Sequence, residues 1–433
     1  MFRNPLRDQS PATLSYVVRL ARDYFASGAT MFFSAGCQFA WFLILARSLG
    51  ATNFGALMMI LAVCNLASAL CGVGAADAML RQTARDSRNY HTMLGHGLLV
   101  IGVTGVVLST IAVVILWGLL SIQVGVDLDL YVIVLFAITN ILLTTFIAYA
   151  EHTFLGLGAF QKANIIEAGF SLVRLLTAAV ACLWFGVGTL GEWAVWSTGA
   201  HLVVLAACIA MVAPLGLPIW NLDRRELLLG FHYCTPRFAD ALRVNCDRIV
   251  LGIVAPASTL ANYAIATRMT QVSQLVVNSL NRIVYPRFAS RKKFGLHSVR
   301  PTAVIYAVSI CVIAVSTAAT IFMVAPVLPW LLGSSYENVV PYLRVLCWLL
   351  VPLAMQTVPY DLLGAFDRHR ERATLYNTTS LAGTALTALV IYSWGVPGAF
   401  VAIYVVECGL ALALWGLLLH LSQPEAADAP AKA

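Results

Sequence analysis

The chain has 433 residues, of which 60% are hydrophobic and 11% are charged, and its formal net charge at pH 7 is +7. A soluble protein carries about 25% charged residues, so this composition, with a mean hydropathy of +0.83, excludes a soluble globular protein and indicates a membrane protein.

The first segment, residues 1–23, carries four arginines and runs directly into an apolar stretch of full spanning length. This is not the pattern of a cleaved signal peptide, so we expect the segment to be retained in the cytoplasm or at the membrane interface. From Leu14 to Phe25, apolar residues at helical spacing lie opposite Arg19 and Arg22. That pattern favours a short interfacial helix, with a frayed polar tail as the alternative.

Apolar stretches of about 20 residues, the length needed to cross a bilayer, then follow one another. They predict twelve membrane-spanning helices, at 24–46, 54–79, 95–120, 130–150, 163–185, 193–213, 228–254, 260–284, 301–324, 340–365, 373–393 and 396–420. Six lie in an N-lobe, 24–213, and six in a C-lobe, 228–420. The predicted cytoplasmic connector is 214–227, and 421–433 forms a cytoplasmic tail. The predicted fold class is therefore an all-α polytopic membrane protein.

The two predicted lobes share short sequence blocks at one offset. Gly158–Lys162 returns as Gly364–Arg368, 206 residues later, and the same offset places Arg81 on Arg287. Aligned echoes of this kind indicate a duplicated chain. An even number of spans per lobe gives both lobes the same orientation, so we expect a pseudo-two-fold axis along the membrane normal.

Basic residues are concentrated on one side of this topology. The N-terminus, the loops that follow even-numbered spans and the tail hold nearly all of the loop arginines and lysines, whereas the opposite loops hold only Arg47. This bias predicts that both termini are cytoplasmic. It also explains much of the net charge, so we expect no nucleic-acid partner.

The seventh predicted span, 228–254, is unusually rich in charge. Its central charged residues are Arg237, Asp240, Arg243, Asp247 and Arg248. They lie within one broad helical face, with opposite charges three or four residues apart. A charge at the bilayer centre costs about 2.5–3.5 kcal/mol, so such groups face protein or a wet cavity. Pro236 begins this region, and we expect it to kink the helix, as in the broken helices of transporters.

In the predicted C-lobe, arginines outnumber acidic residues, which favours a cationic cavity and an anionic ligand. The predicted ligand-binding residues are Arg174, Arg237, Arg243, Arg248 and Arg268. The predicted gating or ion-coupling residues are Glu167, Asp240, Asp247, Asp361 and Glu407. For each residue taken alone, a buried salt bridge that fixes two helices is an equal alternative.

Motifs for catalysis and for cofactors are absent from the sequence. It contains no Gly-rich phosphate loop, no nucleophile elbow and no clustered acidic motif, so we expect neither an enzyme nor an ATP-driven pump. The ten cysteines form no CxxC pair, and the eight histidines have no metal-ligand spacing. We therefore expect no metal and no cofactor.

Several short blocks carry a resemblance to a known family. They are Ala46–Leu57 between the first two spans, Asp247–Gly252, Tyr263–Ala266, Tyr285–Pro286, Gly333–Glu337 and Val340–Leu346. Through them the chain resembles the multidrug/oligosaccharidyl-lipid/polysaccharide (MOP) exporter superfamily, and within it the Wzx-type polysaccharide repeat-unit flippases. The resemblance runs from about residue 24 to residue 420. The chain departs from the family pattern at Ala261, where many relatives carry glycine.

This resemblance implies two six-helix bundles around a central cationic cavity that opens alternately to each side of the bacterial inner membrane. It also implies a cargo of undecaprenyl-pyrophosphate-linked oligosaccharide for O-antigen (lipopolysaccharide), exopolysaccharide or capsule biosynthesis. The residues are compatible with that cargo, because guanidinium groups bind pyrophosphate through paired hydrogen bonds. The implied partners are membrane lipids and a polysaccharide polymerase or chain-length machinery. One chain contains both lobes, so we expect a functional monomer.

Other functions fit the sequence less well. A cation-coupled multidrug antiporter of the same superfamily shares the twelve-helix plan, but cationic substrates call for surplus acid in the cavity. Lipid II flippases are usually longer than this chain and have fourteen spans. A membrane glycosyltransferase or polymerase subunit needs a large extramembrane loop or an acidic motif. A purely structural scaffold would not need the charged seventh span.

Overall fold

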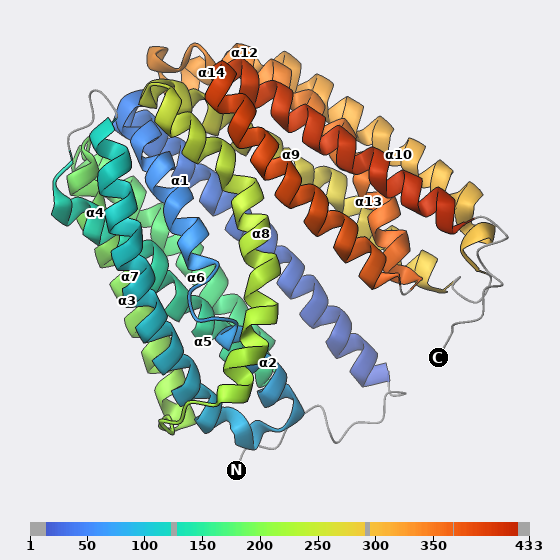
Figure 1. The fold of residues 1–433 in the computed structure, drawn as a ribbon. Coiled ribbons are helices and arrows are strands. Elements are labelled where there is room, and N and C mark those ends of the chain that lie inside the picture. The colour runs from blue at the N-terminus through green and yellow to red at the C-terminus, as the bar shows by residue number, and fades with distance from the viewer. Residues whose placement is uncertain (1–13, 123–127, 291–294, 367, 423–433) are drawn as a thin grey trace. The chain divides into compact units, whose positions relative to one another are not determined.

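The computed structural model describes residues 14–122, 128–290, 295–366 and 368–422. Throughout these residues, all regular elements are helical (Figure 1), which confirms the predicted all-α class. Most of the predicted N-terminal segment, residues 1–13, and nearly all of the predicted tail, residues 423–433, lie outside the described residues. The first helix, α1 (Leu14–Ser68), begins inside the stretch expected to form an interfacial helix.

Within this described part, eight segments are long and apolar enough to cross a membrane. Two of them contain two spans each, because α1 turns at Gly50 and α14 (His369–Leu421) turns at Gly395, both with positive φ. The rings of Phe42 and Phe54 lie 5.0 Å apart although Gly50 separates them, so the two halves of α1 fold back on each other. The charged helices α8 (Arg224–Val254) and α9 (Ala257–Ser290) complete the twelve predicted spans.

The chain divides into two compact units between Asn245 and Cys246, and each is described by itself. After α1, the first unit contains α2 (Ala75–Arg85), α3 (Tyr90–Ile122), α4 (Leu130–Ala137), α5 (Thr144–Gly156), α6 (Phe160–Ala178) and α7 (Leu190–Val212). It also contains the first part of α8. The first unit is held by α1 packed along α6 and by α2 packed against α3 and α5.

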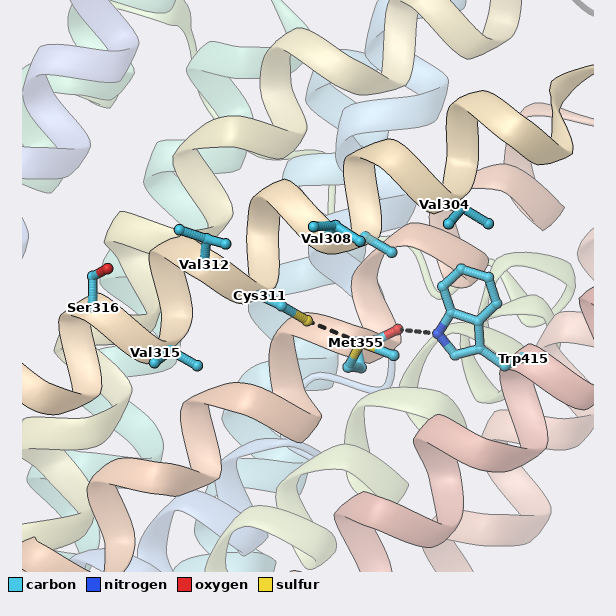
Figure 2. Close-up of a pocket in the computed structure, with 9 residues that line it drawn as sticks. Val304, Val308, Cys311, Val312, Val315, Ser316, Met355 and Trp415 are labelled. Atoms are coloured by element: carbon cyan, nitrogen blue, oxygen red, sulfur yellow. Dashed lines mark hydrogen bonds between the residues drawn. The ribbon is translucent and has the colours of Figure 1, made fainter.

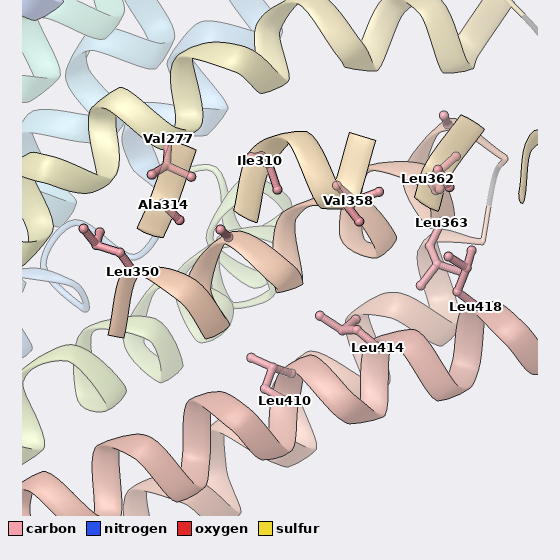
Figure 3. Close-up of a cluster of buried hydrophobic side chains, with 14 of the residues drawn as sticks. Val277, Ile310, Ala314, Leu350, Val358, Leu362, Leu363, Leu410, Leu414 and Leu418 are labelled. Atoms are coloured by element: carbon pink, nitrogen blue, oxygen red, sulfur yellow. The ribbon is translucent and has the colours of Figure 1, made fainter. Parts of the chain in front are cut away.

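The second unit contains the rest of α8, then α9, α10 (Gly295–Val324), α11 (Leu328–Leu332), α12 (Val339–Leu346), α13 (Leu350–Ala365) and α14. Its core lies where α13 packs against α9, α10 and α14. Figure 3 shows this core as a row of aliphatic side chains, with Val358 and Leu362 of α13 near Leu414 and Leu418 of α14. These side chains are almost completely buried.

The elements repeat close to the offset seen in the sequence. Helix α3 begins at Tyr90 and α10 at Gly295, while α7 begins at Leu190 and the second half of α14 follows Gly395. One difference between the halves stands out. The second span of the first half is interrupted between Ser68 and Ala75, whereas its counterpart, α9, is continuous from Ala257 to Ser290.

The division between the units differs from the connector expected at 214–227. The segment before α8 is fastened to the first unit, because the Ile219 N–H donates to the His91 carbonyl at 2.9 Å and the Asp223 N–H donates to His96 Nδ1 at 3.2 Å. Glu226 of α8 is buried and accepts from Gln82 at 2.6 Å and from Arg81. These contacts explain why α8 belongs to the first unit as far as Asn245.

Replacing Glu226 with alanine is expected to lower the free energy of unfolding by about 3 kcal/mol. The change removes the acceptor shared by Arg81 and Gln82, and losing one partner of a buried ion pair destabilises by about 3–5 kcal/mol, with the partial exposure of Arg81 favouring the lower end. Thermal unfolding of the purified protein in detergent measures the loss. The matched control is Glu371→Ala, which removes the exposed pair with Arg368 and should change stability by less than about 1 kcal/mol. Equal shifts for the two variants would contradict the prediction.

Candidate functional site

The second span is broken in the middle of its apolar stretch. The helix ends at Ser68, the backbone turns with positive φ at Gly72 (78°), Val73 (40°) and Gly74 (69°), and α2 resumes at Ala75. The Gly72 N–H donates to the Thr104 hydroxyl at 2.9 Å, which satisfies one of the backbone groups that the break releases. The sequence predicted a continuous span at 54–79, so this prediction was wrong at the break.

Pro236 does not break its own helix. The predicted point of a kink, Pro236, lies inside α8, which continues from Arg224 to Val254 without an interruption. The interruption typical of transporter sites lies in the neighbouring second span instead. The backbone of α8 lies very close to the break in the second span, because a Cβ added at Gly230 of α8 would lie 1.9 Å from the Val73 carbonyl oxygen.

A cavity of about 210 Å³ lies at the break. Its lining residues are Ser68, Ala69, Cys71, Gly72, Gly74, Ala75, Ala76, Ile101, Thr144, Thr145, Ala148, His152, Cys234 and Arg237. The threonines follow a π-helical turn, Ile138–Leu143, and turns of this type are frequent at functional sites. The cavity therefore combines a helix break, a π-turn and the guanidinium of Arg237.

Arg237 is paired with Asp77, an acid that is not among the predicted site residues. Its Nη2 donates to Asp77 Oδ1 of α2 at 2.7 Å. The Arg237 side chain is 51% exposed and that of Asp77 is 21% exposed. The spacing along α8 predicted pairs of Asp240 with Arg237 and with Arg243, and Asp240 accepts from Arg243 at 3.2 Å. Asp77 could have been noticed as a single acid near the end of the second span.

Arg174 of α6 lies against aromatic rings. Its guanidinium carbon is 4.1 Å from the ring centroid of Trp41 and 5.5 Å from that of Phe170, distances typical of cation–π contacts. Trp41 is buried. Glu167 lies about two turns from Arg174 on the same face of α6, where its charge acts on Glu151 of α5. These residues form a second polar region of the first unit.

In the second unit, Asp247, Arg248 and Arg268 form a third polar region. Asp247 is buried and accepts from the Tyr263 hydroxyl at 2.7 Å and from the Arg248 backbone N–H at 2.8 Å. The guanidinium groups of Arg248 and Arg268 lie close enough for their positive charges to repel each other. The Nε atom of Arg248 is buried and makes no hydrogen bond to any described residue. Arg248 thus lies close to both the Asp247 carboxylate and the Arg268 guanidinium.

The remaining predicted acids of the second unit lie elsewhere on its helices. Glu407 of α14 is buried and accepts from the Gln356 side-chain amide of α13 at 2.8 Å. Asp361 is half-buried, and it lies close enough to Arg372 to interact with its positive charge. The Arg372 guanidinium in turn lies 4.2 Å from the Tyr360 ring centroid. The structure therefore groups Asp247 with Arg248 and Arg268, and leaves Asp361 and Glu407 in separate surroundings.

The second unit also contains an apolar groove of about 550 Å³ between α10, α13 and α14. Figure 2 shows valines of α10 along one side, with Trp415 donating to the Met355 carbonyl at 2.8 Å on the other. Ser316 is the one hydroxyl residue in its lining, and no lining residue is charged. This groove offers nothing to hold an anion. Among the described residues, no group of three or more His, Cys, Asp or Glu is placed to hold a metal ion.

Solved structures share this fold. An inward-facing multidrug resistance MATE family transporter of the MOP superfamily is 16% identical, covers 91% of this chain and 96% of its own, and gives a TM-score of 0.73. The lipid II flippase MurJ in an inward closed conformation is 11% identical, covers 92% and 89%, and gives 0.69. The MATE multidrug transporter DinF-BH is 14% identical, covers 97% and 98%, and gives 0.60. Curated proteins give no significant match.

A family model for polysaccharide biosynthesis proteins matches residues 20–292, which is more than half of the chain. The match includes the broken second span, α8 and the Asp247–Tyr263 contact. The chain therefore has the fold of the MOP-superfamily structures, and its apolar helices are those of a multi-pass membrane protein. The chain belongs to the polysaccharide biosynthesis protein family.

Proposed function

We propose that the protein moves an undecaprenyl-pyrophosphate-linked oligosaccharide across the bacterial inner membrane by alternating access, for O-antigen, exopolysaccharide or capsule biosynthesis. The observation that carries this proposal is the pair of guanidinium groups of Arg248 in α8 and Arg268 in α9, with the Asp247 carboxylate next to Arg248. Asp247 accepts from Tyr263 and from a backbone N–H. Two guanidinium groups in membrane-spanning helices attract an anionic ligand.

A pyrophosphate is well matched to such a group. Guanidinium groups are planar, remain charged and bind phosphate oxygens through two parallel hydrogen bonds. The family description supports a polysaccharide cargo, and the fold shared with a flippase and with drug exporters supports a role in export. The positive charge of the same two groups repels a cationic drug, which makes the multidrug antiporter the weaker candidate.

Proteoliposomes that contain the purified protein should flip undecaprenyl-pyrophosphate-linked oligosaccharide faster than protein-free liposomes. The same sugar on undecaprenyl monophosphate should flip at least about tenfold more slowly, because it offers fewer phosphate oxygens to the guanidinium groups. Sugar accessibility on each face, read with and without proton and sodium gradients, measures the rate. The proposal is overturned if neither lipid flips while the gradients drive efflux of a cationic dye.

A further inference from the structure

The break in the second span carries an ion pair whose basic member also lines a cavity. Arg237 donates to Asp77 through one Nη atom, and its side chain is half exposed. Arg237 is also part of the lining of the cavity of about 210 Å³ at the break. A guanidinium has five N–H donors, so the bond to Asp77 uses a fraction of its capacity. Arg237 can therefore hold a second acceptor that enters this cavity.

The rest of the cavity suits an anion. Gly74, Ala75 and Ala76, at the start of α2, belong to its lining, and α2 has no side-chain cap on its first N–H groups. A helix N-terminus of this kind attracts negative charge. The His152 ring also lines the cavity and is held by a 2.8 Å bond between Nδ1 and the Ala148 carbonyl. Among the described residues that line the cavity, none is acidic.

Asp77 is placed so that it can release Arg237. It lies in the first turn of α2, where the helix dipole stabilises a carboxylate. Its Oδ2 atom is buried and makes no hydrogen bond to any described residue, so the pair with Arg237 satisfies only one of its oxygens. The helix dipole therefore offsets part of the cost of leaving this carboxylate without the guanidinium.

We propose that Asp77 is a placeholder for the anionic headgroup: a pyrophosphate that enters the cavity takes Arg237 from Asp77, and Asp77 takes Arg237 back when the headgroup leaves. This inference rests on the proposed function for the source of the pyrophosphate. The cavity is smaller than the roughly 300–1,000 Å³ of pockets for drug-sized ligands, so it accepts a phosphate group and excludes the sugars and the prenyl chain.

The exchange has two physical consequences. Arg237 is neutralised both before and after the headgroup binds, so the cavity at the break never holds an isolated guanidinium. The headgroup also has to compete with a carboxylate that is already in place, which lowers its net affinity. A cargo that is held too tightly could not be released on the far side, so competition by Asp77 favours turnover.

The test measures binding of inorganic pyrophosphate to the purified protein in lipid nanodiscs by isothermal titration calorimetry. Asp77→Asn is expected to bind pyrophosphate about tenfold more tightly than the unchanged protein, equivalent to about 1.4 kcal/mol, because Arg237 no longer has a competing carboxylate. Arg237→Gln is expected to abolish binding at the cavity. The matched control, Glu371→Gln, removes the carboxylate of an exposed pair and should leave the affinity unchanged.

An Asp77→Asn protein that is folded and binds pyrophosphate no more tightly than the unchanged protein overturns the exchange. If Asp77→Asn does not fold, Asp77→Ser provides a second variant with the same expected direction. The double variant Asp77→Asn/Arg237→Gln should be folded and should lose the roughly tenfold gain in pyrophosphate affinity that Asp77→Asn gives alone. Flipping of the lipid-linked sugar without any Asp77 effect would refute the exchange alone, and pyrophosphate exchange without flipping would refute the proposed function alone.

Discussion

The double variant Arg248→Gln/Arg268→Gln is expected to flip undecaprenyl-pyrophosphate-linked oligosaccharide at least about a hundredfold more slowly than the unchanged protein. A hydrogen bond to a charged group contributes about 1.5–3 kcal/mol, so two lost guanidinium contacts correspond to about 3–6 kcal/mol of binding. The variant should still fold, because Asp247 keeps its bonds from Tyr263 and from the backbone N–H of residue 248. Initial flipping rates, normalised to the amount of reconstituted protein, give the comparison.

Two further variants separate charge from geometry. Arg248→Lys/Arg268→Lys keeps both charges but loses the paired donors, so we expect an intermediate rate. Arg368→Gln removes one member of an exposed pair with Glu371 and should flip at the unchanged rate. A double glutamine variant within twofold of the unchanged protein would show that these arginines do not hold the headgroup.

Replacing Gly230 with alanine is expected to destabilise the first unit by about 3 kcal/mol and to lower its midpoint of thermal unfolding by about 10 °C. The new Cβ would lie 1.9 Å from the Val73 carbonyl oxygen, and a Cβ at Gly74 would lie 2.8 Å from the Gly230 backbone. Backbone cannot rotate away as a side chain can, so α8 would have to separate from the break. Thermal unfolding in detergent, followed by size-exclusion chromatography, measures the effect.

Gly199 provides the matched control for this change. It lies in α7, and a Cβ at this position would meet nothing within 4 Å. Gly199→Ala is therefore expected to unfold at the same temperature as the unchanged protein or slightly higher, because alanine restricts the unfolded chain. If both alanine variants unfold alike, the close approach of Gly230 to Val73 does not contribute to stability.

The fold was largely predictable from the sequence because its signal is long and repeated. Apolar stretches of spanning length and one constant offset between echoes indicated the twelve helices and their order, and the structure places α3 and α10 close to that offset. Even the charged helices α8 and α9 were recognised from their place in the series, although their hydropathy is low. These signals average over many residues, so single substitutions do not hide them.

The candidate site was less predictable because its contacts join residues distant in sequence. Spacing along α8 predicted the observed pair of Arg243 with Asp240, three positions apart, but not the pair of Arg237 with Asp77, which are 160 positions apart. The break at Gly72–Gly74 has no proline and interrupts an apolar run, so hydropathy does not register it. The two glycines were its one local signal. Pro236 was the predicted point of disruption, but α8 continues through it without a break.

The turns at Gly50 and Gly395 also bear on how the chain assembles. Each joins two spans without a loop, and close contacts connect the paired spans, as between Phe42 and Phe54 and between Gly383 and Val406. Bringing together two segments costs less conformational entropy when few residues separate them. The first and last pairs of spans are therefore helical hairpins that can form from local contacts alone. The N-terminal pair can do so during synthesis, before the rest of its unit has been made.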